Sequence, residues 1–270
     1  MRKTIYYTDE LNEDFAENGI KTKKIPADFV YLHREWYWRA AATLIYRVIA
    51  WPIVFLFVKV VYLQRFCNRQ VIRQIRKEGG YLYANHTNAL LDVYTPYIVR
   101  LRRRNYIVAG PDAFSIPGIC WLVQMVGGIP LGSTIAQERQ MRECVLERVR
   151  EGNLVTVFPE AHIWPYYTKI RPYRAATFHY PAQDGAAVYT MTHCYRKRRI
   201  GRYVKIDTYL DGPFYADMSL PLPQRRQQLR DRCYDAMCRR AEAYSDYAYW
   251  TYVKKDMESF NEKTEGKQIK

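Results

Sequence analysis

The apolar segment that begins at Trp36 lacks a charge-free run long enough for a simple membrane-spanning helix. Its longest such run, from Val48 to Val58, has eleven residues, whereas a span needs about 20. The first twenty residues are polar and acidic where a cleavable signal peptide would be apolar, so no such signal is expected. No flexible linker, internal repeat or low-complexity tract divides the 270 residues. These absences predict one domain with appendages.

Several catalytic and metal-binding signatures are also missing. The six cysteines form no Cys-x-x-Cys pair, so we expect reduced thiols of a cytoplasmic protein. The five histidines include no pair at zinc spacing, and there is no Gly-x-Ser-x-Gly nucleophile elbow. We therefore expect a site with no metal and no cofactor.

Positive charge is what the sequence has in excess. It carries 42 Lys and Arg residues against 27 Asp and Glu, a net charge of +15, together with 25 tyrosines. This field implies an anionic partner, which can be a nucleic acid, an acidic membrane surface, or a phosphorylated or thioester-carrier substrate. The arginines are dispersed over several predicted helices, and no RNA-recognition, helix-turn-helix or zinc-finger pattern occurs. A basic nucleic-acid binder is thus the less favoured alternative, and no nucleic-acid partner is expected.

Residues 36–78 combine apolar and aromatic side chains with isolated cations. The Trp36-Tyr37-Trp38 cluster suits the headgroup level of a membrane, and Pro52 should kink or divide the helix. The interspersed cations are Arg39, Arg47, Lys59 and Arg65. This composition predicts an interfacial or re-entrant helical hairpin on an anionic membrane, whose second helix continues to Gly79. A buried helix pair remains open, since eleven apolar residues also suit a globular interior.

The stretch from Tyr81 to Tyr97 carries the sharpest chemical signal. Its apolar start predicts a strand buried on both faces, and the helical spacing after Asn88 predicts a helix that holds Asp92. His86 would lie at the carboxyl end of the strand, where open α/β sheets place their ligands. A histidine and an aspartate in contact form a general base with its orienting carboxylate. The alternative is a helix cap beside a dipole-stabilising aspartate, with no chemistry.

The remaining pattern alternates strands and helices. It predicts strands at 106–109, 129–131, 154–158 and 185–195, an edge strand at 202–209, and helices at 118–125, 135–151 and 222–252. The fold class is therefore α/β, a single domain with a mostly parallel central sheet flanked by helices. The predicted division is an arm at 1–35, a membrane-associated helical segment at 36–78, the α/β domain at 79–221, a C-terminal helix at 222–260 and a tail at 261–270.

Asn85-His86 followed by Asp92 resembles the first motif of the glycerolipid acyltransferases, the 1-acylglycerol-3-phosphate acyltransferase family. That family usually places four residues between the histidine and the aspartate, and this chain places five. One extra residue turns a helical side chain by about 100°. The pair can meet only if the turn before the helix absorbs the extra residue, as a cap at Asn88 would allow.

Two later stretches resemble the family's next motifs. Gly128 to Leu131 resembles the second, with Ser133 where the family has an arginine for the acceptor's phosphate. Phe158-Pro159-Glu160 resembles the third, with Ile163 in place of another arginine. Either Arg171 or Arg174 can supply the missing charge, or both lie on a solvated loop. The substrate-binding candidates are Asn85, Gly128, Ile129, Pro130, Ser133, Pro159, Glu160, Arg171 and Arg174.

The resemblance covers roughly residues 80 to 195 and implies a membrane-associated O-acyltransferase of phospholipid biosynthesis. His86 would accept the proton of an acceptor hydroxyl while Asp92 holds the imidazole. The donor would be acyl-CoA or an acyl-acyl-carrier protein, and the acceptor a lysophospholipid such as 1-acylglycerol-3-phosphate. The resemblance also implies a peripheral or monotopic protein on the cytoplasmic side of the cell membrane. A protein of the same fold that binds lipid without catalysis remains the second alternative.

Overall fold

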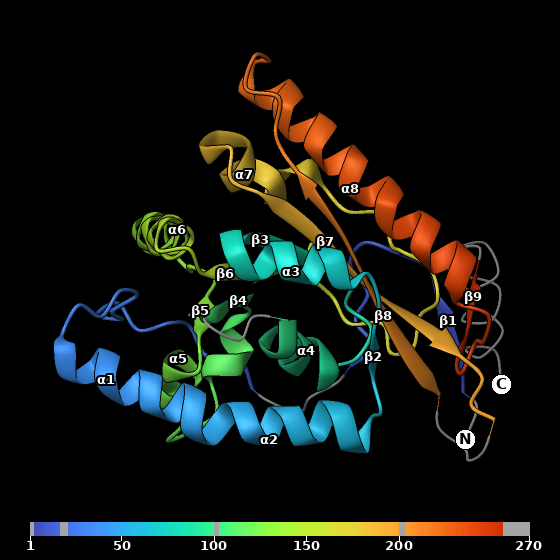
Figure 1. Ribbon diagram of the computed structural model, residues 1–270, viewed down its shortest axis with the longest axis horizontal. Helices are drawn as coiled ribbons and strands as arrows, with labels where there is room; N and C mark the ends of the chain where they lie inside the picture. The colour runs from blue at the N-terminus through green and yellow to red at the C-terminus, as the bar shows by residue number, and fades with distance from the viewer. Residues whose placement is uncertain (1–2, 17–20, 100–102, 200–203, 256–270) are drawn as a thin grey trace, which may run out of the picture.

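A seven-stranded sheet forms the centre of the computed structural model, which describes residues 3–16, 21–99, 103–199 and 204–255 (Figure 1). The strand order is β2-β8-β7-β3-β6-β4-β5, and only the β7–β8 pair is antiparallel. The strands are β2 (Arg65–Phe66), β3 (Gly80–Ala84), β4 (Asn105–Ala109), β5 (Gly128–Pro130), β6 (Leu154–Val157), β7 (Val188–Arg196) and β8 (Lys205–Phe214). The predicted α/β fold with a mostly parallel sheet is confirmed. The strand predicted at the edge, β8, instead has β2 outside it.

Strand β3 lies in the middle of the sheet and is buried along its whole length. Its side chains alternate, so Tyr81 and Tyr83 belong to one apolar cluster while Leu82 and Ala84 belong to the cluster on the other face. Gly80 begins the strand at φ 122°, and a Cβ there would collide with the carbonyl oxygen of Ala187. Glycine is therefore required where the chain enters the sheet.

Helices cover both faces of this sheet. The face that holds Tyr81 and Tyr83 packs against side chains of α6 (Ile135–Arg150) and α8 (Leu222–Tyr244), and the opposite face against α3 (Arg69–Glu78) and α4 (Leu91–Val99). Four short helices of the described residues lie in the connections: η3 (Pro111–Phe114) with α5 (Cys120–Met125), and η4 (Ala175–Phe178) leading into α7 (His179–Asp184). The two-sided covering explains why the central strands read as continuous apolar runs.

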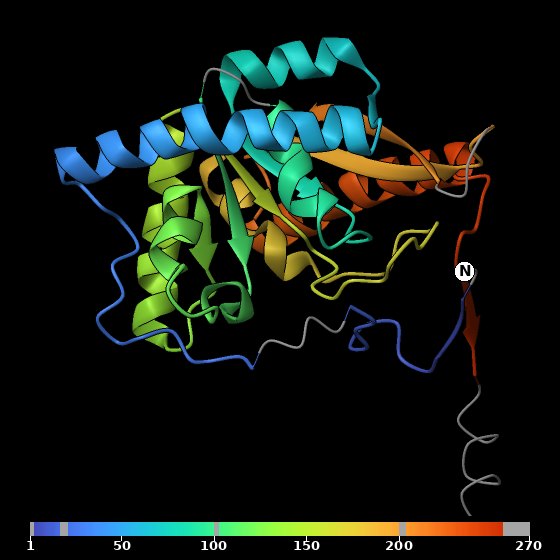
Figure 2. The ribbon, with the colours of Figure 1, turned by 90° about the horizontal axis from the view of Figure 1, so that it is seen from below.

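One long helix replaces the predicted hairpin. It runs through α1 (Trp36–Leu44), η1 (Ile45–Ala50), α2 (Trp51–Leu56) and η2 (Phe57–Val61) and crosses the molecule beside α4 (Figures 1 and 2). Pro52 lies inside this continuous helix, directly after the π turns of η1, and does not divide it. The helix also does not continue into α3, because the chain leaves it after Val61 to form β2. With 26 residues it is long and apolar enough to cross a membrane, contrary to the expectation from its charge-free run.

The buried residues of this helix recur every fourth position: Ala42, Tyr46, Val54 and Val58. An α-helix turns about 100° per residue, so a four-residue repeat would drift by about 40° per step. The wider turns of η1 and η2 remove this drift and keep one straight stripe against α4. Only 17% of its most apolar window is buried, so the outer face remains apolar and exposed. Its most exposed members include Leu44, Val48, Ile49, Ile53, Leu56 and Val60.

The first and last described segments pair with each other. Strand β1 (Thr4–Tyr7) runs parallel to β9 (Thr251–Lys254) in a separate two-stranded sheet. The C-terminal helix thus ends at Tyr244, earlier than predicted, because the following aromatic residues leave it to pack beside Tyr166. The predicted tail, residues 261–270, lies outside the described residues.

Candidate active site

His86 follows the carboxyl end of β3, and its backbone is held on two sides. Its amide N–H donates to Glu160 Oε2 at 3.2 Å, and its carbonyl oxygen accepts the N–H of Trp164 at 3.0 Å. The imidazole stacks on Phe158, with 4.4 Å between ring centroids, and its side chain is 14% exposed. Strand β3 and the loop after β6 therefore fix the position of the ring.

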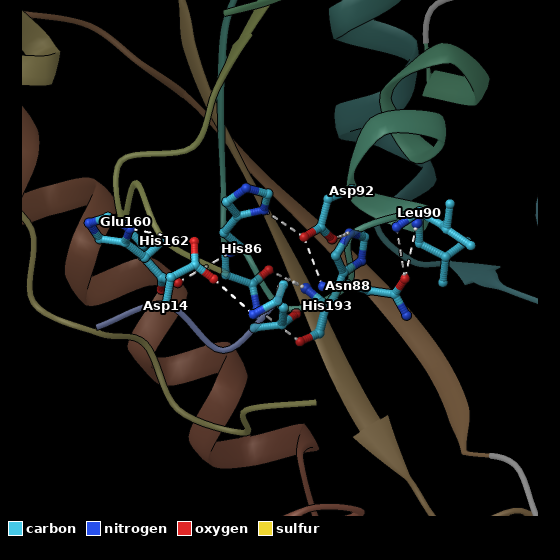
Figure 3. Close-up of polar contacts among 12 residues, drawn as sticks. Asp14, His86, Asn88, Leu90, Asp92, Glu160, His162 and His193 are labelled. Carbon is cyan, nitrogen blue, oxygen red and sulfur yellow. Dashed lines mark hydrogen bonds and ion pairs between the residues drawn. The ribbon is translucent and has the colours of Figure 1, made fainter. Parts of the chain in front are cut away.

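Asp92 reaches His86 because Asn88 caps helix α4. The side-chain oxygen of Asn88 accepts the N–H groups of Leu90 and Leu91 at 3.3 and 3.1 Å. This turn absorbs the fifth intervening residue and leaves Asp92 in the first turn of the helix. Its Oδ2 lies 2.8 Å from His86 Nδ1 and also accepts the backbone N–H of Asn88 at 2.8 Å (Figure 3).

The chemistry of this contact determines the tautomer of His86. An ionised carboxylate only accepts hydrogen bonds, so Nδ1 must carry the proton that Asp92 accepts. The lone pair of the neutral ring is then on Nε2. No hydrogen bond to Nε2 occurs among the described residues. The ring is thereby oriented as a general base whose conjugate acid is stabilised by a fully buried carboxylate.

A second histidine faces the other oxygen of Asp92. His193, on β7, places Nε2 at 3.5 Å from Asp92 Oδ1 (Figure 3). Its Nδ1 lies 2.9 Å from the Thr208 hydroxyl and 3.3 Å from the side-chain amide of Gln64, groups that can donate to it. The proton of the neutral ring is then on Nε2, which faces Asp92 Oδ1 at 3.5 Å without forming a hydrogen bond to it. Burial lowers the pKa of His193, although the nearby charge of Asp92 acts in the opposite direction. The lowered pKa favours the neutral ring.

No motif in the sequence singled out His193, so its place behind Asp92 was missed. Its partners come from separate parts of the chain, and no spacing in the sequence brings them together. The one local signal is Asn85, whose side chain donates to the His193 carbonyl at 3.2 Å and accepts its N–H at 2.8 Å. Asn85 therefore ties the end of β3 to β7 and is itself buried.

Glu160 and Arg171 form a buried ion pair behind His86. Their side chains are both 0% exposed, with Arg171 Nη2 at 3.5 Å from Glu160 Oε2. The carboxylate also accepts the backbone N–H of Arg171 at 3.1 Å, and the guanidinium donates to the carbonyls of Glu10, Glu160 and His162. Burial raises the pKa of Glu160 and lowers that of Arg171, since it disfavours both charged forms. Arg171 is enclosed by protein, which corrects the expectation that it binds substrate.

Comparison with known proteins decides the family. A family model described as Acyltransferase matches residues 65–194, the segment that contains both His86 and Glu160. Residues 65–194 are therefore an acyltransferase domain. The predicted resemblance to an acyltransferase family is thereby confirmed.

The fold of this acyltransferase is similar to a solved structure. The crystal structure of the 1-acyl-sn-glycerophosphate (LPA) acyltransferase PlsC from Thermotoga maritima matches with a TM-score of 0.51 and 15% sequence identity, covering 77% of this chain and 83% of that one. The similarity confirms the shared α/β fold. No curated protein sequence matches this acyltransferase.

The other candidate residues of the acyltransferase do not all gather at His86. Buried Pro159 positions the Glu160 turn. Ile129 and Pro130 belong to β5, and the exposed Ser133 follows it. Because β5 is three strands from β3, these residues lie about 14 Å along the sheet. Gly128 faces a different cavity, described below.

Arg174 remains a candidate on exposure alone. It is exposed at the start of η4, whereas Arg171 is enclosed. None of the described hydrogen bonds or ion pairs links its side chain to His86 or Asp92. Among the described residues, no group of three or more His, Cys, Asp or Glu side chains is placed to hold a metal ion.

The N-terminal arm contributes to the site in a way the sequence did not reveal. The carbonyl oxygen of Glu13 accepts the indole N–H of Trp164 at 2.7 Å. The backbone N–H of Phe15 donates to the carbonyl oxygen of Ile163 at 3.1 Å. Asp14 lies 3.5 Å from His162 Nδ1 (Figure 3). The arm runs across the carboxyl side of the sheet in Figure 2 and braces the loop that follows Glu160.

Proposed function

We propose that this acyltransferase moves a fatty acyl group from a thioester donor to the hydroxyl of a lysophospholipid such as 1-acylglycerol-3-phosphate. The observation that carries the proposal is the His86–Asp92 contact of 2.8 Å, placed at the carboxyl edge of the sheet within the acyltransferase domain. This activity belongs to phospholipid biosynthesis. The fold shared with PlsC supports the choice of a glycerolipid acceptor.

The proposed reaction needs one base and no enzyme-bound acyl group. Nε2 of His86 removes the proton of the acceptor hydroxyl as its oxygen attacks the thioester carbonyl. The tetrahedral intermediate then breaks its carbon–sulfur bond, and the departing thiolate takes the proton back from the imidazolium. Asp92 stabilises that imidazolium and holds the ring in the required tautomer. The donor is acyl-CoA or an acyl-acyl-carrier protein.

An apolar cavity beside the base suits an acyl chain. It has a volume of about 320 Å³ and is lined by Phe57, Val61, Tyr62, Tyr166, Val204, Ile206 and Tyr249, with Arg198 as its cationic residue. Tyr166 donates its N–H to the carbonyl of Thr87, the residue after His86, at 2.8 Å. The cavity extends from the end of the long helix to Tyr166, which contacts the catalytic turn, and we propose that it holds the acyl chain there.

The proposed location is the cytoplasmic side of the cell membrane, with the long helix lying at the interface. One side of this helix packs on the domain and the other exposes apolar residues beside Trp36 and Tyr37, which are 79% and 60% exposed. Apolar side chains next to interfacial aromatics and cations favour adsorption to an anionic bilayer.

The activity test compares two histidine variants. Purified protein is incubated with acyl-CoA and a panel of lysolipids and glycolipid alcohols, and products are read by mass. His86→Ala should lower the rate by about 10²- to 10⁴-fold, because it removes the base. The matched control His162→Ala removes an imidazole that is 37% exposed and pairs with the arm, and it should retain activity.

Parent-like turnover in His86→Ala would refute the assigned base. Lipid binding by the parent without any product would favour the non-catalytic alternative. A salt-dependent shift of a labelled oligonucleotide, with no lipid binding, would favour the nucleic-acid alternative.

A further inference from the structure

A second cavity lies at the opposite edge of the sheet from His86. Its volume is about 350 Å³, and it is enclosed between α1 with η1 on one side and the beginnings of β4 and β6 on the other. Asn153 and Tyr106 line it from the strands, and Ala42 and Thr43 line it from the long helix. Because His86 follows the far end of β3, the two sites are separated by the length of the strands, about 15 Å.

This cavity concentrates positive charge. Its lining includes five arginines and a single acidic residue, Glu151. The arginines are Arg39, Arg47, Arg103, Arg104 and Arg148. Like charges gathered in a partly enclosed space repel one another more strongly than in water. The excess of cations over carboxylates therefore favours an anion within the cavity.

Glu151 is already shared among its neighbours. Arg148 donates to its Oε2 at 3.0 Å, Arg39 lies 3.8 Å from its Oε1, and Arg103 donates to its backbone carbonyl at 2.6 Å. Asn153 also donates to Oε2 at 3.0 Å. One carboxylate cannot neutralise the charge of the five arginines.

Three buried donors of this cavity have no hydrogen-bond partner among the residues that the structure describes. They are Nε of Arg104, Nε of Arg148 and the hydroxyl of Tyr31. Arg104 and Arg148 stack on the Tyr106 ring, which holds both guanidinium planes in place. Unsatisfied buried N–H and O–H groups are costly, and oriented guanidinium groups match the oxygens of a phosphate.

We propose that this arginine cavity binds the phosphate group of an anionic ligand, separately from the acyl-transfer site. The arrangement favours the headgroup of a membrane phospholipid as the source. Arg39, Thr43 and Arg47 come from the long helix, and their sequence neighbours Leu44 and Val48 are 59% and 62% exposed. A lipid whose phosphate enters the cavity can thus lay its chains along the apolar face of the same helix.

The test uses a double variant and a charge-matched control. Arg39→Gln with Arg103→Gln removes two cavity cations without touching the pair stacked on Tyr106. Arg34→Gln with Arg139→Gln removes two exposed cations outside the cavity, whose partners are Glu147 and Glu143. Both proteins lose the same net charge, so a difference between them reports on the cavity.

Two measurements identify the source of the phosphate. Titration calorimetry with inorganic phosphate reports binding in solution. Flotation with phosphatidylcholine vesicles that contain either phosphatidic acid or phosphatidylglycerol, at equal surface charge, reports recognition of a lipid phosphomonoester. The cavity variant should bind the phosphate-bearing ligand at least about tenfold more weakly than the control.

Selective retention on phosphatidic acid vesicles, lost in the cavity variant alone, would support the lipid source. Calorimetric binding of inorganic phosphate without vesicle selectivity would support the phosphate site with a soluble source. Equal affinities of the cavity variant and its control in both measurements would overturn the proposal. None of these measurements uses acyl transfer, so a protein without acyltransferase activity could still test whether the cavity binds phosphate.

Discussion

Replacing Arg171 with alanine should destabilise the acyltransferase rather than weaken its affinity for a phosphate-bearing acceptor. The side chains of Arg171 and Glu160 are both fully buried. Removing one partner of a buried ion pair costs about 3–5 kcal/mol because the other charge stays behind unpaired. Glu160 keeps backbone donors from His86 and Arg171, but the carbonyls of Glu10 and His162 lose theirs. This loss is a large share of a typical stability of about 5–15 kcal/mol.

Urea and thermal unfolding measure the effect. At about 2–4 °C per kcal/mol, Arg171→Ala should melt about 6–20 °C below the parent. Arg174→Ala is the control, because this neighbouring arginine is exposed and should change stability by about 0.5 kcal/mol or less. Parent-like stability of Arg171→Ala together with weaker use of lysophosphatidic acid would refute the reasoning and return Arg171 to the acceptor site.

The Glu160 carboxyl adds a pH dependence of known sign. Burial raises its pKa in the folded state above the ordinary value of 4.5. The folded protein then holds the carboxyl proton of Glu160 more tightly than the unfolded chain does. The resulting contribution to the free energy of unfolding is present below pH 4.5 and is lost as pH rises through the folded pKa. Glu160→Gln should remove this component, which unfolding midpoints across that range would measure; an unchanged pH profile would contradict it.

Three further outcomes are expected. Asp92→Asn should lower kcat by about 10²- to 10⁴-fold because the amide no longer stabilises the imidazolium, and retained kcat in steady-state kinetics would contradict this role. Burial lowers the pKa of His193 below its ordinary 6.5, so its contribution to stability should be lost as pH falls below 6.5. In urea titrations, His193→Gln should reduce this loss of unfolding free energy at low pH. An equal pH dependence in the variant would assign the loss to other groups. Ile53→Ser, at a residue 62% exposed, should weaken vesicle flotation with an unchanged melting temperature, whereas Val58→Ser, at a residue 0% exposed, should lower that temperature; identical behaviour of the two would contradict the assigned faces.

The strands of the central sheet were predictable because each carries its own signal. The apolar run of β3 and the β-branched run of β6 lie close to their predicted positions. The long helix was not predictable as one continuous element, since a proline such as Pro52 usually breaks a helix interior. Its shape depends on packing against α4 and on π turns, which local patterns do not encode.

At the site, local contacts were predictable and distant ones were not. The Asn88 cap follows from the residues between His86 and Asp92, and the structure has it. The place of His193 depends on β7 pairing beside β3, and the burial of Arg171 depends on the N-terminal arm. A basic loop residue in the sequence looks the same whether it faces solvent or a buried carboxylate.

The pairing of β1 with β9 has a consequence for the order of assembly. Thr4 aligns with Thr251, so the arm that braces the loop after Glu160 gains its strand partner from the far end of the described chain. During synthesis, the catalytic turn and its histidine emerge long before that partner does. The arm must therefore wait unpaired while the sheet forms, and the loop beside His86 acquires its final support as one of the last events of folding.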